Sequence, residues 1–240
     1  MNEKFYEILD KKCKKIKIDL SDEQISRFYK YYKILVDTNK VVNLTAITEM
    51  EEVIEKHFVD SLSLIKIGKI ENQNIIDIGT GAGFPGIPLK IAFPKIKVTL
   101  LDSLNKRVNF LNSVILELNL KNIEVIHGRA EDFGNNQQYR ELYDISVSRA
   151  VSNLSSLSEY CLPFVKEGGY FIAYKSGNSD EEILEAKGAI FKLSGKIELT
   201  EKFTLPDSNV ERSLVIIKKC GKMSKKYPRK AGLPTKEPLK

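Results

Sequence analysis

A glycine-rich segment at residues 75–86 carries the clearest chemical signal in the sequence, Ile-Ile-Asp-Ile-Gly-Thr-Gly-Ala-Gly-Phe-Pro-Gly. The apolar residues before Gly79 predict a buried strand that runs into a turn and then a helix. Glycines let such a turn adopt positive φ and approach a ligand closely. Three glycines, beginning with Gly81, match the dinucleotide-binding fingerprint, although a lone match is weak. Asp77 would repel a pyrophosphate, so it favours a ligand that carries an α-ammonium group.

A second acidic residue, Asp102, ends the next apolar run. An acidic side chain at the end of a second strand can accept two hydrogen bonds from a ribose diol. After the third apolar run, residues 128–132 (Gly-Arg-Ala-Glu-Asp) form a loop whose acidic side chains or backbone amides can bind an adenine edge. These positions indicate a nucleoside ligand, and they fit NAD and S-adenosylmethionine alike. A solvated aspartate at a strand end is the alternative for Asp102.

From residue 74 on, short apolar runs alternate with helical stretches, which is typical of βαβ units and a mostly parallel sheet. We expect strands at residues 74–78, 97–101, 123–127, 143–147, 169–175, 196–203 and 213–218, and helices near residues 86–92, 106–118, 153–162 and 180–193. No helix separates the last two strands, so they should form an antiparallel hairpin at the sheet edge. The fold class is therefore α/β with seven strands.

The first 66 residues are expected to be helical. Phe5, Ile8 and Leu9 have helical spacing, and Ser21 looks like the N-cap of a second helix. A polar turn is expected at residues 37–40, followed by a third helix at about residues 49–64.

Length and composition predict one domain of 240 residues with three parts: a helical extension (1–66), a catalytic core (67–220) and a tail (221–240). The net charge of +6 lies in the tail, and the first 220 residues are balanced. Prolines and Gly232 oppose regular structure there. Few histidines and three scattered cysteines argue against a metal site or disulfides. No apolar run approaches the ~20 residues that span a bilayer, so a cytoplasmic protein is expected.

Several short motifs together resemble the bacterial 16S ribosomal RNA guanine-N7 methyltransferases, the RsmG (GidB) family. They are Asn-Leu-Thr at 43–45, His-Phe-Val-Asp-Ser-Leu at 57–62, the glycine segment from Asp77 to Gly86, Leu-Asp-Ser at 101–103 with Lys106 and Arg107, Arg-Ala-Glu at 129–131 and Ser-Arg-Ala at 148–150. The resemblance covers nearly the whole chain and is more specific than the glycine segment alone.

The resemblance implies a class I methyltransferase, with a Rossmann-like sheet and an N-terminal helical extension, that moves a methyl group from S-adenosylmethionine to N7 of a guanine and releases S-adenosylhomocysteine. The substrate would be 16S rRNA near the decoding-site hairpin. The donor-binding residues implied by the family and by the general class I roles are Asp77, Gly79, Gly81, Phe84, Asp102, Ala130, Glu131 and Arg149.

Guanine N7 has a free lone pair and no proton at neutral pH, so attack on the methyl group needs no general base. Positioning and electrostatics suffice, and Arg149 is the expected positioning residue. Methylation of cytosine C5 would need a thiolate, but Cys161 lies where a helix end is expected, and we interpret it as a core residue.

RNA binding requires phosphate neutralisation. The candidates are Lys106, Arg107, Arg129, Lys175, Arg212, Arg229 and Lys230, with the other basic residues of the tail. We expect removal of the tail to weaken RNA binding and to spare donor binding. The partner is the small subunit or an assembly intermediate of it, the protein is expected to be a monomer, and no metal or membrane partner is expected.

Several alternatives stay open. Arg149 can pair with a carboxylate at the sheet edge, and packing or one hydrogen bond can explain His57. Residues 43–45 either order the donor entrance or connect helices. An NAD(P)-dependent oxidoreductase and a non-catalytic RNA-binding protein are the competing functions.

Overall fold

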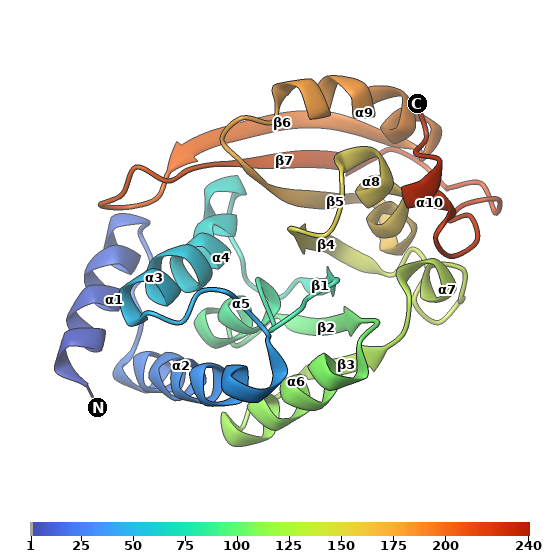
Figure 1. Ribbon diagram of the computed structural model, residues 1–240. Helices are drawn as coiled ribbons and strands as arrows, with labels where there is room; N and C mark the ends of the chain where they lie inside the picture. Colours follow the sequence, from blue (N-terminus) through green and yellow to red (C-terminus); the bar gives the residue numbers. More distant parts are fainter. Residues whose placement is uncertain (1) are drawn as a thin grey trace.

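The computed structural model describes residues 2–240. A seven-stranded sheet of order β3-β2-β1-β4-β5-β7-β6 crosses the molecule (Figure 1). Its strands are β1 (Asn74–Ile78), β2 (Lys97–Asp102), β3 (Ile123–His127), β4 (Tyr143–Arg149), β5 (Val165–Ser176), β6 (Gly195–Thr204) and β7 (Glu211–Lys219). All neighbouring pairs from β3 to β5 are parallel, while β7 pairs antiparallel with both β5 and β6. The seven strands and the C-terminal hairpin are confirmed.

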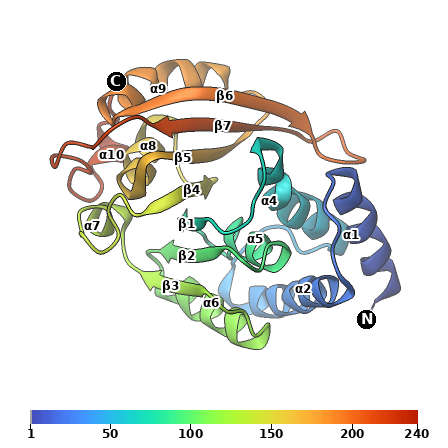
Figure 2. The ribbon, with the colours of Figure 1, turned by 180° about the vertical axis from the view of Figure 1, so that it is seen from behind.

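The two faces of the sheet carry separate hydrophobic cores because successive strand residues point to opposite faces. Ile75 belongs to one core and Ile76 to the other. The first core lies under the N-terminal helices, α5 (Gly86–Ala92) and α6 (Asn105–Glu117); the second lies under α8 (Leu154–Cys161) and α9 (Asp180–Lys192). The opposite views in Figures 1 and 2 show these two layers of helices with the sheet between them.

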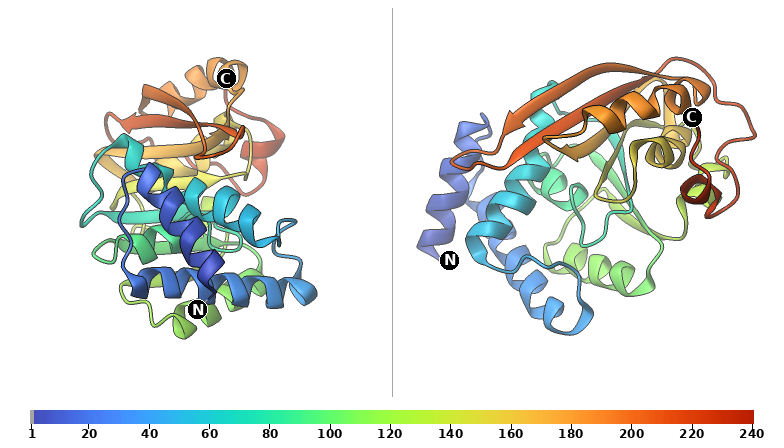
Figure 3. Two further views of the ribbon diagram at one scale, coloured as in Figure 1. Left: turned by 90° about the vertical axis from the view of Figure 1, so that its left-hand side faces the viewer. Right: turned by 45° about the horizontal axis from the view of Figure 1, so that its top comes forward.

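The N-terminal helices share the first core with the sheet. They are α1 (Glu3–Lys15), α2 (Asp22–Val42) and a continuous helical stretch made of α3 (Met50–Val53), the π-helical η1 (Ile54–Val59), α4 (Asp60–Leu62) and the 3₁₀ turn η2 (Ser63–Ile67). Phe5, Phe28 and Phe58 are fully buried and their rings pack together. Figure 3 shows these helices stacked beside the sheet. The extension is therefore part of the packed body.

One sequence expectation in this region is wrong. Residues 37–40 do not form a turn, because α2 continues to Val42 and ends at Asn43, which has a left-handed conformation with φ 51°. Asp37 and Lys40 lie on the exposed side of the helix and form an ion pair there, while Thr38 and Asn39 are half-buried. The side chain of Asn39 then accepts hydrogen bonds from the amides of Leu44 and Thr45 and fixes the exit from the helix.

Two further expectations, both near the carboxyl edge of the sheet, also need correction. The loop expected at residues 128–132 contains the start of a short helix, α7 (Ala130–Gly134). The tail contains a short helix, α10 (Leu233–Lys236), and it lies against α8. Figure 2 shows α10 beside α8. Met223, Tyr227 and Pro234 are buried in the described structure, so the tail is a packed segment of the body.

Candidate donor-binding site

The glycine segment forms a tight turn between β1 and α5. Gly79 has φ +68° and its amide donates to the carbonyl of Leu101 on the neighbouring strand at 2.8 Å. A Cβ atom on Gly79 would lie 2.6 Å from a methyl group of Val151. Both the backbone conformation and the close approach of Val151 therefore require glycine at this position.

Asp77 lies beneath this turn and is completely buried. Its Oδ2 accepts hydrogen bonds from the Thr80 hydroxyl at 2.7 Å and the Gly86 amide at 2.8 Å, and its Oδ1 has no hydrogen-bond partner. Burial raises the pKa of this carboxyl to about 7, against the lowering effect of the two hydrogen bonds. Asp77 thus holds the shape of the glycine turn from inside the fold.

The carboxyl ends of β1, β2 and β3 meet at a pocket of about 170 Å³. The pocket brings together four of the predicted donor-binding residues, Gly79, Asp102, Ala130 and Glu131. Its other lining residues are Ile78, Leu101, Ser103, Gly128, Arg129, Val151 and Tyr160. Asp77, Gly81, Phe84 and Arg149 do not line it. Ligands of open α/β sheets bind at this edge, outside the carboxyl ends of the strands.

Asp102 is almost fully buried at the pocket wall. Its Oδ2 accepts from the Gly81 amide at 2.9 Å and its Oδ1 from the Leu104 amide at 2.9 Å. The Arg107 guanidinium lies 3.4 Å from Oδ2. Asp102 therefore joins the glycine turn to the start of α6, and this brings Gly81 close to the pocket although Gly81 does not line it.

The residues that line the pocket fit an adenosine group chemically. Asp102 supplies carboxylate oxygens at the end of β2, and Ile78, Leu101 and Val151 supply apolar walls. The space is nevertheless smaller than the roughly 300 Å³ at which ligand pockets begin. Val151 lies against Gly79 and follows Ala150, whose φ of +57° is strained for a residue with a side chain. The Val151 side chain therefore narrows the pocket beside Gly79.

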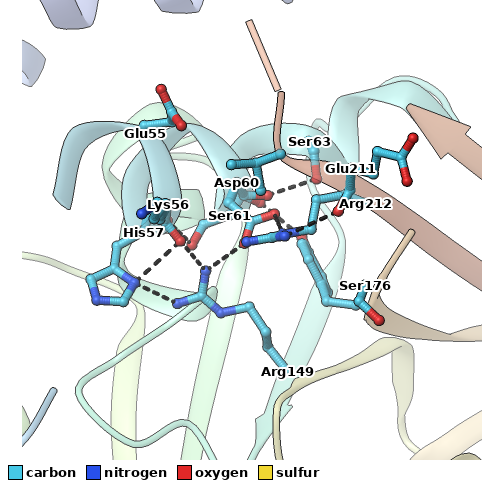
Figure 4. Close-up of polar contacts among 12 residues, drawn as sticks. Glu55, Lys56, His57, Asp60, Ser61, Ser63, Arg149, Ser176, Glu211 and Arg212 are labelled. Atoms are coloured by element: carbon cyan, nitrogen blue, oxygen red, sulfur yellow. Dashed lines mark hydrogen bonds and ion pairs between the residues drawn. The ribbon is translucent and has the colours of Figure 1, made fainter. Parts of the chain in front are cut away.

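Arg149 ends β4 and enters a polar cluster with the helical stretch of the N-terminal extension (Figure 4). Its Nη1 donates to Asp60 Oδ2 and to the carbonyl oxygen of Lys56, each at 3.0 Å. Both carboxylate oxygens of Asp60 also accept from Arg212 Nε, each at 3.2 Å. The Asp60 side chain is only 3% exposed. The carboxylate pairing that was the alternative for Arg149 is thus present in the structure.

His57 contacts both Arg149 and Phe84. Its ring stacks on the Phe84 ring with centroids 4.4 Å apart, and the Arg149 guanidinium lies over the same Phe84 ring. His57 Nδ1 is 3.2 Å from Arg149 Nη2, and Nε2 is 2.9 Å from the Thr45 hydroxyl. Burial, with the Arg149 charge next in size, lowers the pKa of His57 to about 3, so the ring is neutral near pH 7.

Four predicted RNA-binding residues have carboxylate partners inside the protein. Arg107 pairs with Asp102, as described above. Lys175 pairs with Glu182 at 2.6 Å, Arg212 with Asp60, and Arg229 with Glu159 at 2.7 Å. These pairs leave less of their positive charge for phosphates. Lys106 and Lys230 are exposed.

Sequence reasoning did not anticipate Val151 and Tyr160 in the donor pocket. Neither position carries a motif, since the fold brings them there.

Among residues 2–240, no group of three His, Cys, Asp or Glu side chains is placed to hold a metal ion. In the same residues, no helix is long and apolar enough to cross a membrane. A larger hollow of about 540 Å³, lined by residues including Asp144 and Tyr170, lies toward the opposite edge of the sheet.

The sheet order and the glycine turn define the class I S-adenosylmethionine-dependent methyltransferase fold. Solved structures agree with this at the level of the fold. A SAM-dependent methyltransferase from Aquifex aeolicus superposes with a TM-score of 0.53 at 19% identity, covering 78% of this chain and 97% of that one. M. jannaschii TYW2, solved in complex with AdoMet, gives a TM-score of 0.50 at 16% identity over 66% and 74% of the two chains.

Sequence relatives are more specific. The family model described as rRNA small subunit methyltransferase G matches residues 24–215. The ribosomal RNA small subunit methyltransferase G of Lachnoclostridium phytofermentans is 56% identical over 223 residues, 92% of each chain. The protein of the same name from Clostridium botulinum strain Loch Maree is 52% identical over 237 residues, which cover 98% of this chain and 99% of that one. The chain belongs to the rRNA small subunit methyltransferase G family.

Proposed function

We propose that this protein transfers a methyl group from S-adenosylmethionine to N7 of a guanine in 16S rRNA of the small ribosomal subunit. One observation carries the proposal: a chain of this family places Gly79, Asp102 and Glu131 around one pocket at the carboxyl edge of a class I sheet. In the cell the protein would act in the cytoplasm as a monomer, on the decoding-site hairpin of the subunit or of an assembly intermediate.

The residues at the pocket divide the work of holding the donor. Asp102 accepts hydrogen bonds from the ribose hydroxyls, and the backbone of Ala130 and Glu131 borders the adenine. The glycine turn, including Gly79 and Gly81, would border the rest of the donor, and Asp77 would hold the shape of this turn from beneath it. Phe84 and Arg149 would border the reacting end, since both belong to the cluster beside the glycine turn. When bound, the donor supplies an electrophilic methyl group on a sulfonium.

The titratable groups around this cluster support a reaction without a general base. His57 is buried and neutral, and its two ring nitrogens already contact Thr45 and Arg149. The Cys161 thiol is fully buried, and burial raises its pKa, which disfavours the thiolate that cytosine C5 methylation requires. Guanine N7 attacks through its free lone pair and needs neither group. The chain contributes positioning and electrostatic stabilisation.

For the rRNA we propose contacts at the exposed basic residues near the pocket and on the C-terminal segment. Lys106 stands at the start of α6, Arg129 lines the pocket and is exposed, and Lys230 lies on the C-terminal segment. Arg107 stands one residue further and touches Asp102. The charges of Lys175, Arg212 and Arg229 would serve mainly in their ion pairs within the protein. We expect these residues to contribute less to phosphate binding than the exposed lysines.

The test is methyl transfer by the purified protein to small subunits that lack the modification, with methyl-labelled S-adenosylmethionine and nucleoside analysis of the product. We expect label in 7-methylguanosine. Label in another nucleoside, or none, would contradict the proposal. The matched pair of variants is Gly79→Asp and Gly221→Asp. The first adds a charged side chain where Val151 leaves no room, while a Cβ on Gly221 meets nothing within 4 Å. Only the first variant should lose donor binding in calorimetry.

Calorimetry also separates the oxidoreductase alternative. The wild-type protein is titrated with NAD and with S-adenosylmethionine under the same conditions. Binding of NAD without binding of S-adenosylmethionine would overturn the donor assignment.

A further inference from the structure

The C-terminal segment, residues 221–240, touches the donor pocket through two of its lining residues. The Gly232 amide donates to Glu131 Oε1 at 2.9 Å. The hydroxyls of Thr235 and Tyr160 lie 2.6 Å apart. Glu131 and Tyr160 come from α7 and α8 and both line the pocket. Figures 1 and 2 show α10 close to both helices from opposite sides.

A buried ion pair anchors the same segment. Glu159 precedes Tyr160 in α8 and is fully buried. Arg229 surrounds its carboxylate: the backbone amide donates at 2.8 Å, Nε at 2.9 Å and Nη2 at 2.7 Å. A buried carboxylate that loses its cation is strongly unfavourable. The position of residues 159–160 therefore depends on Arg229.

The outer side of the segment is cationic. Its exposed lysines are Lys222, Lys225, Lys226, Lys230, Lys236 and Lys240. Within residues 2–240, none of them has an Asp or Glu partner within 4 Å. Lys230 follows Arg229 directly, and Lys236 follows Thr235 directly. Lys230 and Lys236, which are free to bind phosphates, are thus direct sequence neighbours of Arg229 and Thr235, which contact α8 beside the pocket.

We propose that residues 229–235 support the wall of the methyl-donor pocket from outside, through Glu131, Glu159 and Tyr160, and that they couple phosphate binding on the lysine side of the segment to donor affinity. Arg229 is a positioning residue that acts through Glu159, and Thr235 acts through Tyr160. RNA that holds Lys230 and Lys236 stabilises the wall and strengthens donor binding, and by linkage the donor strengthens RNA binding to the same extent. The proposal rests on the proposed function, because it takes the pocket as the donor site. It replaces the expectation that the tail affects RNA alone.

The first experiment measures S-adenosylmethionine affinity by calorimetry in the full-length protein without RNA. Thr235→Val keeps the side-chain shape and removes the hydroxyl partner of Tyr160, so we expect about a five-fold weaker affinity, the effect of one net hydrogen bond. Arg229→Gln should weaken it by about ten-fold or more because Glu159 loses its cation. Lys230→Gln is the control and should bind like wild type. In steady-state methylation, Thr235→Val should raise the donor KM while kcat stays unchanged.

The second experiment measures coupling with S-adenosylhomocysteine, which does not react. Small ribosomal subunits should raise its affinity for the wild-type protein, and the gain should shrink in a Lys230→Gln/Lys236→Gln variant. An equal gain in both proteins overturns the coupling. Wild-type donor affinity in both Thr235→Val and Arg229→Gln overturns the wall; if Arg229→Gln does not fold, Thr235→Val decides alone. Failure of the wild-type protein to bind the donor overturns the proposed function instead.

Discussion

Removal of the Asp60 carboxylate should destabilise the protein strongly, because Asp60 neutralises two arginines from different parts of the fold. Arg149 comes from β4 and Arg212 from β7, while Asp60 belongs to the N-terminal helical stretch. The exposed fractions are 3% for the Asp60 side chain, 14% for Arg149 and 24% for Arg212. Breaking a buried ion pair by removing one partner costs about 3–5 kcal/mol. Both arginines keep other partners and some solvent, so we expect about 3 kcal/mol for Asp60→Ala.

Urea unfolding, followed by circular dichroism, measures this cost. Glu117→Ala is the matched control, because it removes an acidic partner of Lys30 that is 52% exposed. The control should change the free energy of unfolding by less than about 0.5 kcal/mol. If Asp60 acts through the arginines, the Asp60→Ala/Arg212→Ala double variant should lose at least about 1 kcal/mol less than the sum of the single losses. A cost for Asp60→Ala as small as that of the control, or strict additivity, would refute the reasoning.

Three further predictions concern the donor pocket and the RNA surface. Burial raises the pKa of the Asp77 carboxyl from 3.8 to about 7. Between these pH values the folded protein keeps the proton and the unfolded chain loses it. The free energy of unfolding of the wild-type protein therefore falls as pH rises through this range. Asp77→Asn cannot ionise, so its free energy of unfolding relative to wild type should rise by up to about 1.4 kcal/mol per pH unit between pH 4 and 7. Urea titrations at several pH values measure this difference, and a difference that does not change with pH would contradict the raised pKa. Val151→Ala should tighten S-adenosylmethionine binding about threefold in calorimetry, because less side chain must leave Gly79 before the donor enters; weaker binding would mean that Val151 packs on the donor. Neutralising Lys226 and Lys230 should make the slope of log K against log salt for small-subunit binding shallower by about 1.5, and an unchanged slope would exclude both residues as phosphate contacts.

The sequence predicts the sheet well because the central strands β1, β2 and β4 are largely buried and apolar, and because the apolar residues of the half-buried β3 still form a short run. The expected bounds of residues 74–78 and 123–127 agree with β1 and β3. The turn expected at residues 37–40 is wrong because local polarity does not distinguish a turn from the solvent side of a helix. The prolines of the tail predicted an irregular segment, but the partners that fix it, Glu131 and Glu159, lie far away in the sequence.

The site was predictable to the extent that it is local. Gly79 and Asp102 sit at strand ends that parallel topology must bring together. The pairing of Arg149 with Asp60 joins residues 89 positions apart, and no spacing rule connects them. Val151 and Tyr160 line the pocket only because the chain after β4 folds back over the glycine turn. The rule that ligands bind at the carboxyl ends of parallel strands locates the site from the sequence. Only the tertiary structure shows which other side chains line the pocket there.

The most direct test of the account is nucleoside mass spectrometry of 16S rRNA from cells that lack this protein, with and without a plasmid copy. The account predicts that 7-methylguanosine is missing from the small-subunit rRNA of the deletion strain, that the wild-type copy and Gly221→Asp restore it, and that Gly79→Asp does not. A 7-methylguanosine content that is unchanged in the deletion strain would contradict the proposed activity.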